Sequence, residues 1–281
     1  MAVVVKDIAG MREIVLSARA ELASVGFVPT MGALHEGHMS LVRAAKKEND
    51  VCVVSVFVNP IQFGPGEDYE RYPRAFDQDK ELLERNGADT IFKASVEEMY
   101  PGGFGTYVVQ DRLPDLLCGK SRPGHFRGVM TVCAKLFNIV KPDRAYFGQK
   151  DFQQTVVIRR MVRDLGFGID VRVLPTVRDA DGLALSSRNA YLAPDERQRA
   201  LAIHRALVGA RDAFARGERD RDAIVRGMRA ALAAPGGVEV DYTEVVDADT
   251  LEAANPVSGE SVAVIAARVG QTRLIDNACL A

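Results

Sequence analysis

Two histidines stand three residues apart in the stretch PTMGALHEGHMSL, residues 29–41, and the whole chain contains only four histidines. The preceding residues, VGFVP, are typical of a strand, and the residues from His38 onward have the apolar spacing of a helix. We therefore expect His35 and His38 at the start of a helix, where an (i, i+3) spacing points them the same way. Unpaired backbone N–H groups at that helix end favour a phosphate, and two imidazoles could donate hydrogen bonds to it.

Two other interpretations of this pair stay open. The histidines could be structural residues that cap the helix. They could also hold a metal, although the HEGH spacing is one residue short of the H-E-x-x-H pattern that gives zinc two ligands on one helix face.

Two further junctions carry groups that suit a polyphosphate. The stretch AYFGQKDFQQ again runs from strand through glycine into helix, and it places Lys150 and Asp151 at the junction. A lysine acts as a mobile point charge for phosphates, whereas Asp151 could accept a hydrogen bond from a ribose hydroxyl or simply cap the helix. The loop DGLALSSRN contains two serines followed by Arg188, which could clamp a phosphate or belong to an ordinary surface turn.

Side-chain amides and carboxylates follow the apolar run VCVVSVFV, residues 51–58. Asn59 and Gln62 lie just beyond its carboxyl end, where amides could recognise hydroxyl and carboxylate groups of a small substrate. A polar loop is the alternative. In FDQDKE, Asp77 and Asp79 could approach Mg²⁺ directly or through water, or they could cap the helix that begins there.

The stretch SRPGHFRGV forms another loop before a helix. Its Arg122, His125 and Arg127 could bind an anionic substrate or serve the fold. The sequence alone does not separate these two roles.

The elements that must position these groups alternate between strand and helix over the first 175 or so residues. Apolar runs at 25–29, 51–58, 90–94 and 145–148 predict strands, and the run 51–58 is apolar enough for a parallel strand buried on both faces. Amphipathic stretches between them predict helices, and IDVRVLPTV closes the series. This alternation predicts an α/β fold with a parallel sheet, in which ligands bind beyond the carboxyl ends of the strands.

The pattern changes near residue 180. Helices are predicted at about 194–216 and 220–234, and the alternating stretches GGVEVDYTEVVDA and SVAVIAARVGQTRLID predict antiparallel strands. We therefore predict two domains, an α/β domain at residues 1–180 and a smaller α+β domain at residues 181–281. The Gly/Pro-rich stretch at 64–73 is expected to be a loop.

Composition and charge limit the class of protein. The 281 residues carry a formal net charge of -2, which gives no bulk attraction to nucleic acid or to an anionic membrane. The N-terminus lacks the pattern of a signal peptide, and no apolar run approaches the roughly 20 residues of a membrane span. The four cysteines form no C-x-x-C pair, and Cys52 and Cys133 lie in apolar runs typical of buried thiols. We expect a cytoplasmic protein with no nucleic-acid or membrane partner.

Taken in order, PTMGALHEGH, FVNPIQF, SRPGHFRGV, FGQKDFQQ, DGLALSSRN and TRLIDN resemble the pantothenate synthetase (pantoate–β-alanine ligase) family, and the resemblance runs essentially end to end. It implies a Rossmann-like nucleotidyltransferase domain of the H-x-G-H superfamily and a smaller C-terminal α+β lid domain. It also implies that (R)-pantoate and β-alanine are condensed through a pantoyl-adenylate, with ATP converted to AMP and pyrophosphate. Mg²⁺ and a homodimer are implied as well.

The resemblance assigns catalytic roles to four residues of this chain. His38 matches the proton donor, His35 lies beside it on the phosphates, and Lys150 and Arg188 complete the catalytic set. The implied ATP-binding residues are Met31, Gly32, Ala33, Leu34, His35, Glu36, Gly37, His38, Gly148, Gln149, Lys150, Asp151, Val177, Leu185, Ser186, Ser187 and Arg188.

The resemblance also names substrate and metal residues. Gln62 and Gln154 match the residues that hold pantoate, and Gln62 also lies near the β-alanine position; Asp79 is the metal candidate. The chain departs from the family pattern in two places. Gln149 stands where a glutamate is expected, and Gln78 stands where relatives more often carry an acid, which puts the contribution of this loop to Mg²⁺ binding in doubt.

Two alternatives come from different classes. Another H-x-G-H nucleotidyltransferase would adenylylate a phosphate ester, but its acceptor site should be basic, and the amides of Gln62 and Gln154 favour a hydroxy acid instead. A nucleotide-binding regulatory module would bind ATP and release no pyrophosphate.

Overall fold

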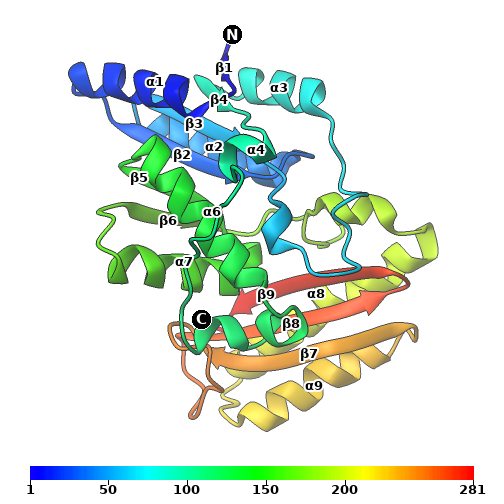
Figure 1. The fold of residues 1–281 in the computed structure, drawn as a ribbon. Coiled ribbons are helices and arrows are strands. Elements are labelled where there is room, and N and C mark those ends of the chain that lie inside the picture. Colours follow the sequence, from blue (N-terminus) through cyan, green and yellow to red (C-terminus); the bar gives the residue numbers. More distant parts are fainter. The chain divides into compact units, whose positions relative to one another are not determined.

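The computed structural model describes all residues, 1–281, and the chain forms two compact units (Figure 1). The second unit contains the C-terminal part of the chain together with two short segments from the middle of the sequence. The first unit comprises Met1–Pro114, Arg122–Gly148 and Val157–Pro175, and the second comprises Asp115–Ser121, Gln149–Val156 and Thr176–Ala281.

A six-stranded parallel sheet organises the first unit. Its strands are β1 (Val3–Val5), β2 (Val25–Thr30), β3 (Val51–Val56), β4 (Thr90–Phe92), β5 (Arg144–Gly148) and β6 (Asp170–Leu174). They lie in the order β1-β4-β3-β2-β5-β6, and every neighbouring pair is parallel. The inner residues of β3 are buried, which explains why its sequence lacks polar alternation.

Helices cover both faces of this sheet, as Phe27 and Val28 of β2 demonstrate, because successive strand residues face opposite sides. The helices of this unit are α1 (Ile8–Ala20), α2 (Glu36–Glu48), α3 (Phe76–Arg85), α4 (Val96–Met99) and α6 (His125–Val140), with a 3-10 turn η1 (Pro60–Gln62). Val28 belongs to a buried cluster with residues of α2 and α3. Phe27 instead meets Phe137 of α6 edge-on, with ring centroids 6.4 Å apart.

The order in which the chain builds this sheet reverses between β2 and β5. The strands β3 and β4 extend it on one side of β2, whereas β5 and β6 extend it on the other, and β2 pairs directly with β5. Open α/β sheets bind ligands beyond the carboxyl ends of their strands at such a point. The turn that carries residues 31–35 follows β2, and β5 ends at Gly148, so two of the predicted junctions follow neighbouring strands here.

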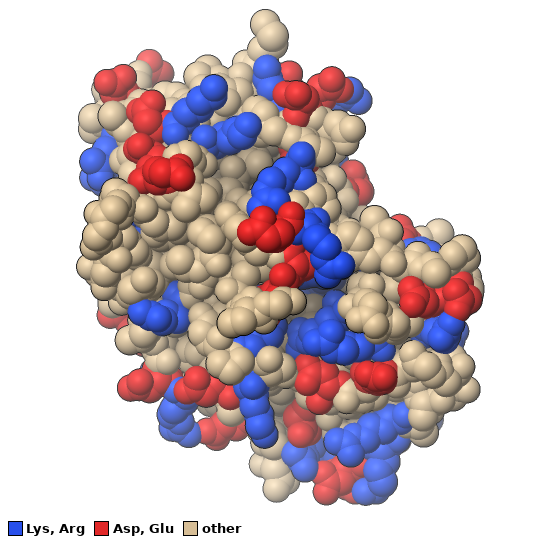
Figure 2. All heavy atoms as spheres, turned by 45° about the vertical axis from the view of Figure 1, so that its right-hand side comes forward, with Lys and Arg blue, Asp and Glu red and all other residues tan.

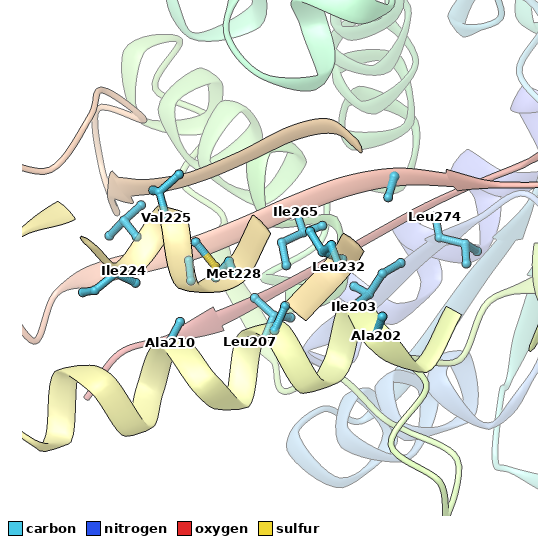
Figure 3. Close-up of a cluster of buried hydrophobic side chains, with 14 of the residues drawn as sticks. Ala202, Ile203, Leu207, Ala210, Ile224, Val225, Met228, Leu232, Ile265 and Leu274 are labelled. Carbon is cyan, nitrogen blue, oxygen red and sulfur yellow. The ribbon is translucent and has the colours of Figure 1, made fainter. Parts of the chain in front are cut away.

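The second unit is built on a three-stranded antiparallel sheet in the order β7-β8-β9, with two long helices packed on it. Its core joins apolar residues of both helices to the sheet, including Leu207, Met228 and Ile265 (Figure 3). The elements are α8 (Pro194–Ala215), α9 (Arg221–Ala233), β7 (Val238–Asp247), β8 (Ser261–Val269), β9 (Thr272–Cys279), α5 (Cys118–Ser121), and the 3-10 turns η3 (Gln149–Asp151) and η4 (Ser187–Tyr191). Two elements run from one unit into the other, namely η2 (Leu113–Asp115) and α7 (Phe152–Asp164).

The predicted parallel sheet and the smaller α+β region are confirmed, and the structure adds β1 and α1, which the sequence did not predict. The strand predicted at 51–58 ends two residues earlier, at Val56, although the Phe57 N–H still donates to the Thr30 carbonyl of β2. Cys52 and Cys133 are buried, as expected. None of the helices has the length and apolar character needed to cross a membrane. On the face shown in Figure 2, basic and acidic side chains are interspersed.

Candidate active site

The turn between β2 and α2 is sharp, and the Asp79 carboxylate lies close to it. Gly32 and Ala33 both have positive φ angles, +86° and +50°, so the chain turns sharply after the strand. Thr30 secures the strand end by donating its hydroxyl to the Ser55 carbonyl at 2.6 Å. His35 is the N-cap of α2, and the N–H groups of the first helical turn follow it.

The two histidines of this turn lie together, as their spacing predicts. Their ring centroids are 4.1 Å apart. His35 Nδ1 accepts the Gly37 N–H at 3.2 Å, and His38 Nδ1 accepts the His35 N–H at 3.3 Å. Because an Nδ1 that accepts a hydrogen bond carries no proton, each neutral imidazole has its proton on Nε2. In this tautomer the pair carries two Nε2–H groups, which are hydrogen-bond donors of the kind that suit phosphate oxygens.

The side chain of Asp79 stabilises the same turn through hydrogen bonds to its backbone. Its two carboxylate oxygens accept the N–H groups of Ala33 at 3.0 Å and Leu34 at 2.8 Å, and its side chain is buried. Burial raises the pKa of Asp79 above its ordinary value, although these two hydrogen bonds oppose that change. Asp79 therefore supports the turn, rather than capping α3, whose N-cap is Ala75. Glu36, also in the predicted ATP set, pairs its carboxylate with Arg43.

Gln62 lies at the end of η1, beyond the carboxyl end of β3, and it is buried. Its Nε2 donates to the sulfur of Met31 at 3.1 Å, so a predicted substrate residue contacts the predicted ATP-binding turn. Its Oε1 accepts from Asn59 Nδ2 at 2.9 Å. The backbone of η1 also approaches α6 closely, because a Cβ on Gly128 would lie 2.3 Å from the Ile61 carbonyl oxygen.

The basic residues of SRPGHFRGV hold the loop around Gln62. Arg122 forms a two-pronged ion pair with Glu67 at 2.7 and 2.6 Å, and His125 Nδ1 lies 2.8 Å from the carbonyl oxygen of Gln62. Burial raises the pKa of Glu67, but the hydrogen bonds and charge of Arg122 outweigh it, so the pKa lies below its ordinary value. A cavity of about 220 Å³ adjoins this loop, lined in part by Gln62, His125 and Arg127.

In the second unit, the predicted phosphate lysine stands on a backbone fixed to β9. Asn277 donates from Nδ2 to the carbonyls of Gln149 at 2.9 Å and Lys150 at 3.0 Å. Gln149 Nε2 in turn donates a hydrogen bond to Asn277 Oδ1 at 3.3 Å. The glutamine that departs from the family pattern thus serves a structural contact. These contacts hold the backbone of Lys150 and do not involve its ammonium group.

Two adjacent glutamines at the start of α7 have different surroundings. Gln153 is buried and bridges the backbone of the segment 115–121, accepting from the Cys118 N–H at 2.9 Å and donating to the Leu116 carbonyl at 2.7 Å. Gln154 is half-buried and makes no such bridge. Gln154, the residue predicted to hold pantoate, is therefore the more exposed of the two.

The loop that leads to Ser186 and Ser187, in the second unit, is closed by a backbone hydrogen bond between its two ends. Leu185 donates its N–H to the Val177 carbonyl at 3.0 Å, which brings together two residues of the predicted ATP set. Arg178 anchors this loop to β9 through two hydrogen bonds to Asp276, at 2.5 and 3.0 Å. Ser186 then caps η4 by accepting the N–H of Arg188 at 3.3 Å.

The predicted site residues thus fall into two groups. The first unit holds Met31, Gly32, Ala33, Leu34, His35, Glu36, Gly37, His38, Gln62, Asp79 and Gly148, and the second holds Gln149, Lys150, Asp151, Gln154, Val177, Leu185, Ser186, Ser187 and Arg188. Sequence reasoning assigned no role to the buried residues Gly128 and Asn277, which contact η1 and the backbone of Lys150, or to the half-buried Tyr100, which bonds Asn59. Gly128 and Asn277 lie in stretches that carry the family resemblance, but the elements they contact are far away in sequence.

The donor set for a divalent metal is sparse. No group of three His, Cys, Asp or Glu side chains could enclose a metal ion. The metal candidate Asp79 already accepts two backbone hydrogen bonds. Mg²⁺ in nucleotide sites commonly keeps several waters and binds through substrate phosphates with one or two carboxylates. The residues present do not form an all-protein Mg²⁺ site.

Comparison with known proteins assigns the family. The family model for pantoate-beta-alanine ligase matches residues 3–279. A pantothenate synthetase of Moorella thermoacetica is 54% identical over 275 residues, which cover 98% of this chain and 97% of that protein. A pantothenate synthetase of Thermotoga petrophila is 54% identical over 277 residues, covering 99% of each.

Solved structures give the same result. Pantothenate synthetase from Thermus thermophilus superimposes with a TM-score of 0.94 at 47% identity, covering 99% of each chain. Pantoate-beta-alanine ligase from Francisella tularensis, complexed with beta-gamma ATP and beta-alanine, has a TM-score of 0.81 at 33% identity and covers 100% of this chain and 98% of its own. With two units built as described and relatives matched along the whole length, the chain belongs to the pantoate-beta-alanine ligase family, whose members join pantoate to β-alanine through an amide bond.

Proposed function

We propose that this ligase works in two steps, first activating (R)-pantoate with ATP and then transferring it to β-alanine. In the first step the pantoate carboxylate attacks the α-phosphorus of ATP, which forms pantoyl-adenylate and releases pyrophosphate. In the second step the neutral amine of β-alanine attacks the activated carbonyl, which forms the amide and releases AMP. The side chains need form no covalent bond with the substrate.

The paired histidines carry this proposal. Negative charge develops on the departing pyrophosphate, and the Nε2–H groups of His35 and His38 are donors that stand beside a helix N-terminus. Donors fixed before the reaction need no reorganisation as the charge appears, which makes them effective catalytic groups. We assign His38 the role of proton donor and His35 a role on the phosphates.

Cationic groups would neutralise the repulsion between the two anionic substrates. Lys150 has a backbone held by Asn277, and Arg188 follows a serine that caps its short helix. A lysine is a mobile point charge and an arginine is a planar fork, and both suit phosphate oxygens. We propose that these two residues bind the triphosphate together with the backbone and hydroxyl groups of Ser186 and Ser187.

The amides of Gln62 and Gln154 would orient pantoate for attack in line with the leaving group. Orientation of this kind contributes to rate by converting a chance encounter into a fixed geometry. Gln62 is buried and hydrogen-bonded at its oxygen, which limits its movement. A side chain restrained in this way loses little entropy when substrate binds.

The role of Mg²⁺ is proposed only as an accompaniment of ATP. Because the chain offers no all-protein cage, we propose that the ion arrives on the triphosphate, where it would offset phosphate charge. We assign no reaction step to it. Asp79 would contribute by stabilising the turn at residues 33–34, and it would not bind the ion directly.

One assay tests the two-step scheme. Purified protein is mixed with ATP, Mg²⁺ and pantoate, and pyrophosphate release is followed before and after β-alanine is added. We expect one equivalent of pyrophosphate per site without β-alanine, and continuous release of pyrophosphate and AMP with amide product after its addition. A protein that binds ATP but releases no pyrophosphate would be a nucleotide-binding module, and the scheme would be wrong.

A homodimer and a cytoplasmic location also belong to the proposal. Both follow from the family resemblance. Sedimentation velocity at several protein concentrations tests the first, and cell fractionation tests the second.

A further inference from the structure

A chain of hydrogen-bonded side chains leads from the half-buried Tyr100, at the end of α4, through buried Asn59 to buried Gln62 within the first unit. The Tyr100 hydroxyl donates to Asn59 Oδ1 at 2.7 Å, and Asn59 Nδ2 donates to Gln62 Oε1 at 2.9 Å. Asn59 is only 1% exposed and Gln62 8%, so each must satisfy its polar atoms within the protein. Tyr100 lies at the C-cap of α4, 41 residues after Asn59.

The direction of the Asn59 amide follows from its partners. Asn59 Nδ2 also lies 3.2 Å from the carbonyl oxygen of Gly128, which can only accept. The nitrogen must therefore face Gly128, and the oxygen must face the Tyr100 hydroxyl. Burial raises the pKa of Tyr100 well above its ordinary value, so the phenol keeps its proton and remains a donor at neutral pH.

The direction of the Gln62 amide follows in turn. Because an N–H of Asn59 points at it, Gln62 must turn its oxygen toward Asn59 and its nitrogen away. That nitrogen meets the sulfur of Met31 at 3.1 Å. A thioether sulfur is a weak acceptor, so an oxygen atom of a ligand would be a better partner for the same N–H group.

We propose that Tyr100 is a positioning residue that, through Asn59, locks the Gln62 amide with its nitrogen toward the substrate, so that the site selects an acid substrate by an acceptor oxygen. The oxygen belongs to a carboxylate or a hydroxyl. This inference rests on the proposed binding of pantoate at Gln62. Tyr100 itself touches Asn59 and not the substrate.

Tyr100 also has a packing role, which its test must separate from the hydrogen bond. Its ring lies against Phe57 and Phe104, with centroids 6.1 and 4.9 Å away. The substitution Tyr100→Phe keeps the ring and removes only the hydroxyl. It leaves the Asn59 oxygen buried without its donor, which is unfavourable for a buried polar atom.

The chain offers a matched control in Tyr146. Its hydroxyl accepts from Asn49 Nδ2 at 2.8 Å, its ring is fully buried, and it belongs to the same unit. The same hydroxyl donates to Glu48 at 3.0 Å. Tyr146→Phe therefore removes a tyrosine–asparagine and a tyrosine–glutamate hydrogen bond, neither of which leads to Gln62. We expect Tyr100→Phe to raise the KM for pantoate about tenfold, the change that corresponds to about 1.4 kcal/mol. The KM for ATP should stay within about twofold, and Tyr146→Phe should move neither constant.

A second pair of variants tests the direction of the amide. In Asn59→Asp, both oxygens of the ionised carboxylate accept, so Gln62 must turn its nitrogen inward and present its oxygen to the substrate, and the test is made at a pH high enough to ionise it. In Asn59→Ala, Gln62 is free to adopt either direction. We therefore expect Asn59→Asp to weaken pantoate binding more than Asn59→Ala, the opposite of the order that lost packing volume would produce.

The outcomes separate this inference from the proposal beneath it. Gln62→Ala should raise the KM for pantoate, and an unchanged value would remove pantoate from Gln62 altogether. If Gln62→Ala has its effect but Tyr100→Phe matches Tyr146→Phe, the positioning role of Tyr100 is wrong while the substrate site stands. Asn59→Ala proving worse than Asn59→Asp, with both proteins folded by circular dichroism, would likewise overturn the proposed amide direction.

Discussion

The two units hold their candidate functional groups in different ways. In the first unit the side chains themselves are restrained, since His35 and His38 each accept a backbone N–H and Gln62 is bonded to buried Asn59. In the second unit the contacts restrain the backbone instead. Asn277 donates a hydrogen bond to the backbone carbonyl of Lys150, whereas the Lys150 ammonium group lies at the end of a long, flexible side chain.

This difference separates two tasks in the proposed reaction. Groups that must meet a developing charge or orient a nucleophile need fixed directions, and a small displacement costs rate. Groups that neutralise a polyphosphate need charge and reach more than direction. We therefore expect the first unit to be intolerant of small geometric changes and the second to tolerate changes that keep charge.

The largest expected effect comes from the first unit. His38→Ala should lower the rate of pyrophosphate release with ATP and pantoate by roughly 10²–10³, the scale of losing one fixed donor to a transition state. Rapid-quench measurement of the first turnover gives this rate directly. His204→Ala in the second unit is the control and should leave it nearly unchanged. A near wild-type first turnover in His38→Ala would remove this residue from catalysis.

Charge should dominate at Lys150. Lys150→Gln should raise the KM for ATP about 10- to 100-fold, because a hydrogen bond to a charged group contributes about 1.5–3 kcal/mol. Lys150→Arg should recover most of this loss. Steady-state kinetics at two salt concentrations provide the measurement, and ATP affinity should fall less steeply with salt in Lys150→Gln than in the wild type or Lys150→Arg. Equal losses in both variants would contradict the contrast between the units.

Matched glycine substitutions compare the packing of the two units. Gly128→Ala should destabilise the protein by about 1–3 kcal/mol and raise the KM for pantoate, because the new Cβ would lie 2.3 Å from the Ile61 carbonyl oxygen beside Gln62. Gly209→Ala on α8 has open space around the new atom and should stabilise its helix by about 0.5–1 kcal/mol. Urea unfolding measures both changes. A neutral Gly128→Ala would mean that η1 can move freely.

The smallest expected effect is a pH dependence of the second unit. Burial, together with the charge of Arg178, lowers the pKa of His204 below 6.5. Below pH 6.5 the unfolded chain therefore binds a proton that the folded protein resists, so the free energy of unfolding should fall as the pH drops. The melting temperature between about pH 7.5 and 5.5 should decline less steeply in His204→Gln. Parallel curves for the two proteins would show that His204 contributes nothing to this slope.

Much of the fold could be predicted because burial leaves a pattern in the sequence. The run VCVVSVFV has no polar alternation, and β3 is buried in the middle of the sheet. The stretch IDVRVLPTV alternates, and β6 is the edge strand, partly exposed along its length. By contrast, β1 is only three residues long, too short for a period to be recognised.

The site could be predicted only as far as its groups cluster in sequence. The histidine pair was visible because both residues belong to one helical turn. The role of Asp79 was not visible, because its partners are backbone N–H groups 45 and 46 residues earlier, and any residue type supplies those. The same holds for Gln153 and Gln154, which differ only through contacts with a segment 35 residues away.

The path of the chain has a consequence for how this protein can be divided. The polypeptide passes between the units at residues 114/115, 121/122, 148/149, 156/157 and 175/176. A fragment that starts at residue 176 would lack the segments 115–121 and 149–156. Arg273 and Asn277 of β9 make hydrogen bonds to these two segments, at Cys118 and Gln149 respectively. Chimaeras that exchange the C-terminal region between relatives would therefore need to exchange residues 115–121 and 149–156 as well. Chimaeric proteins made with a single crossover should fold poorly.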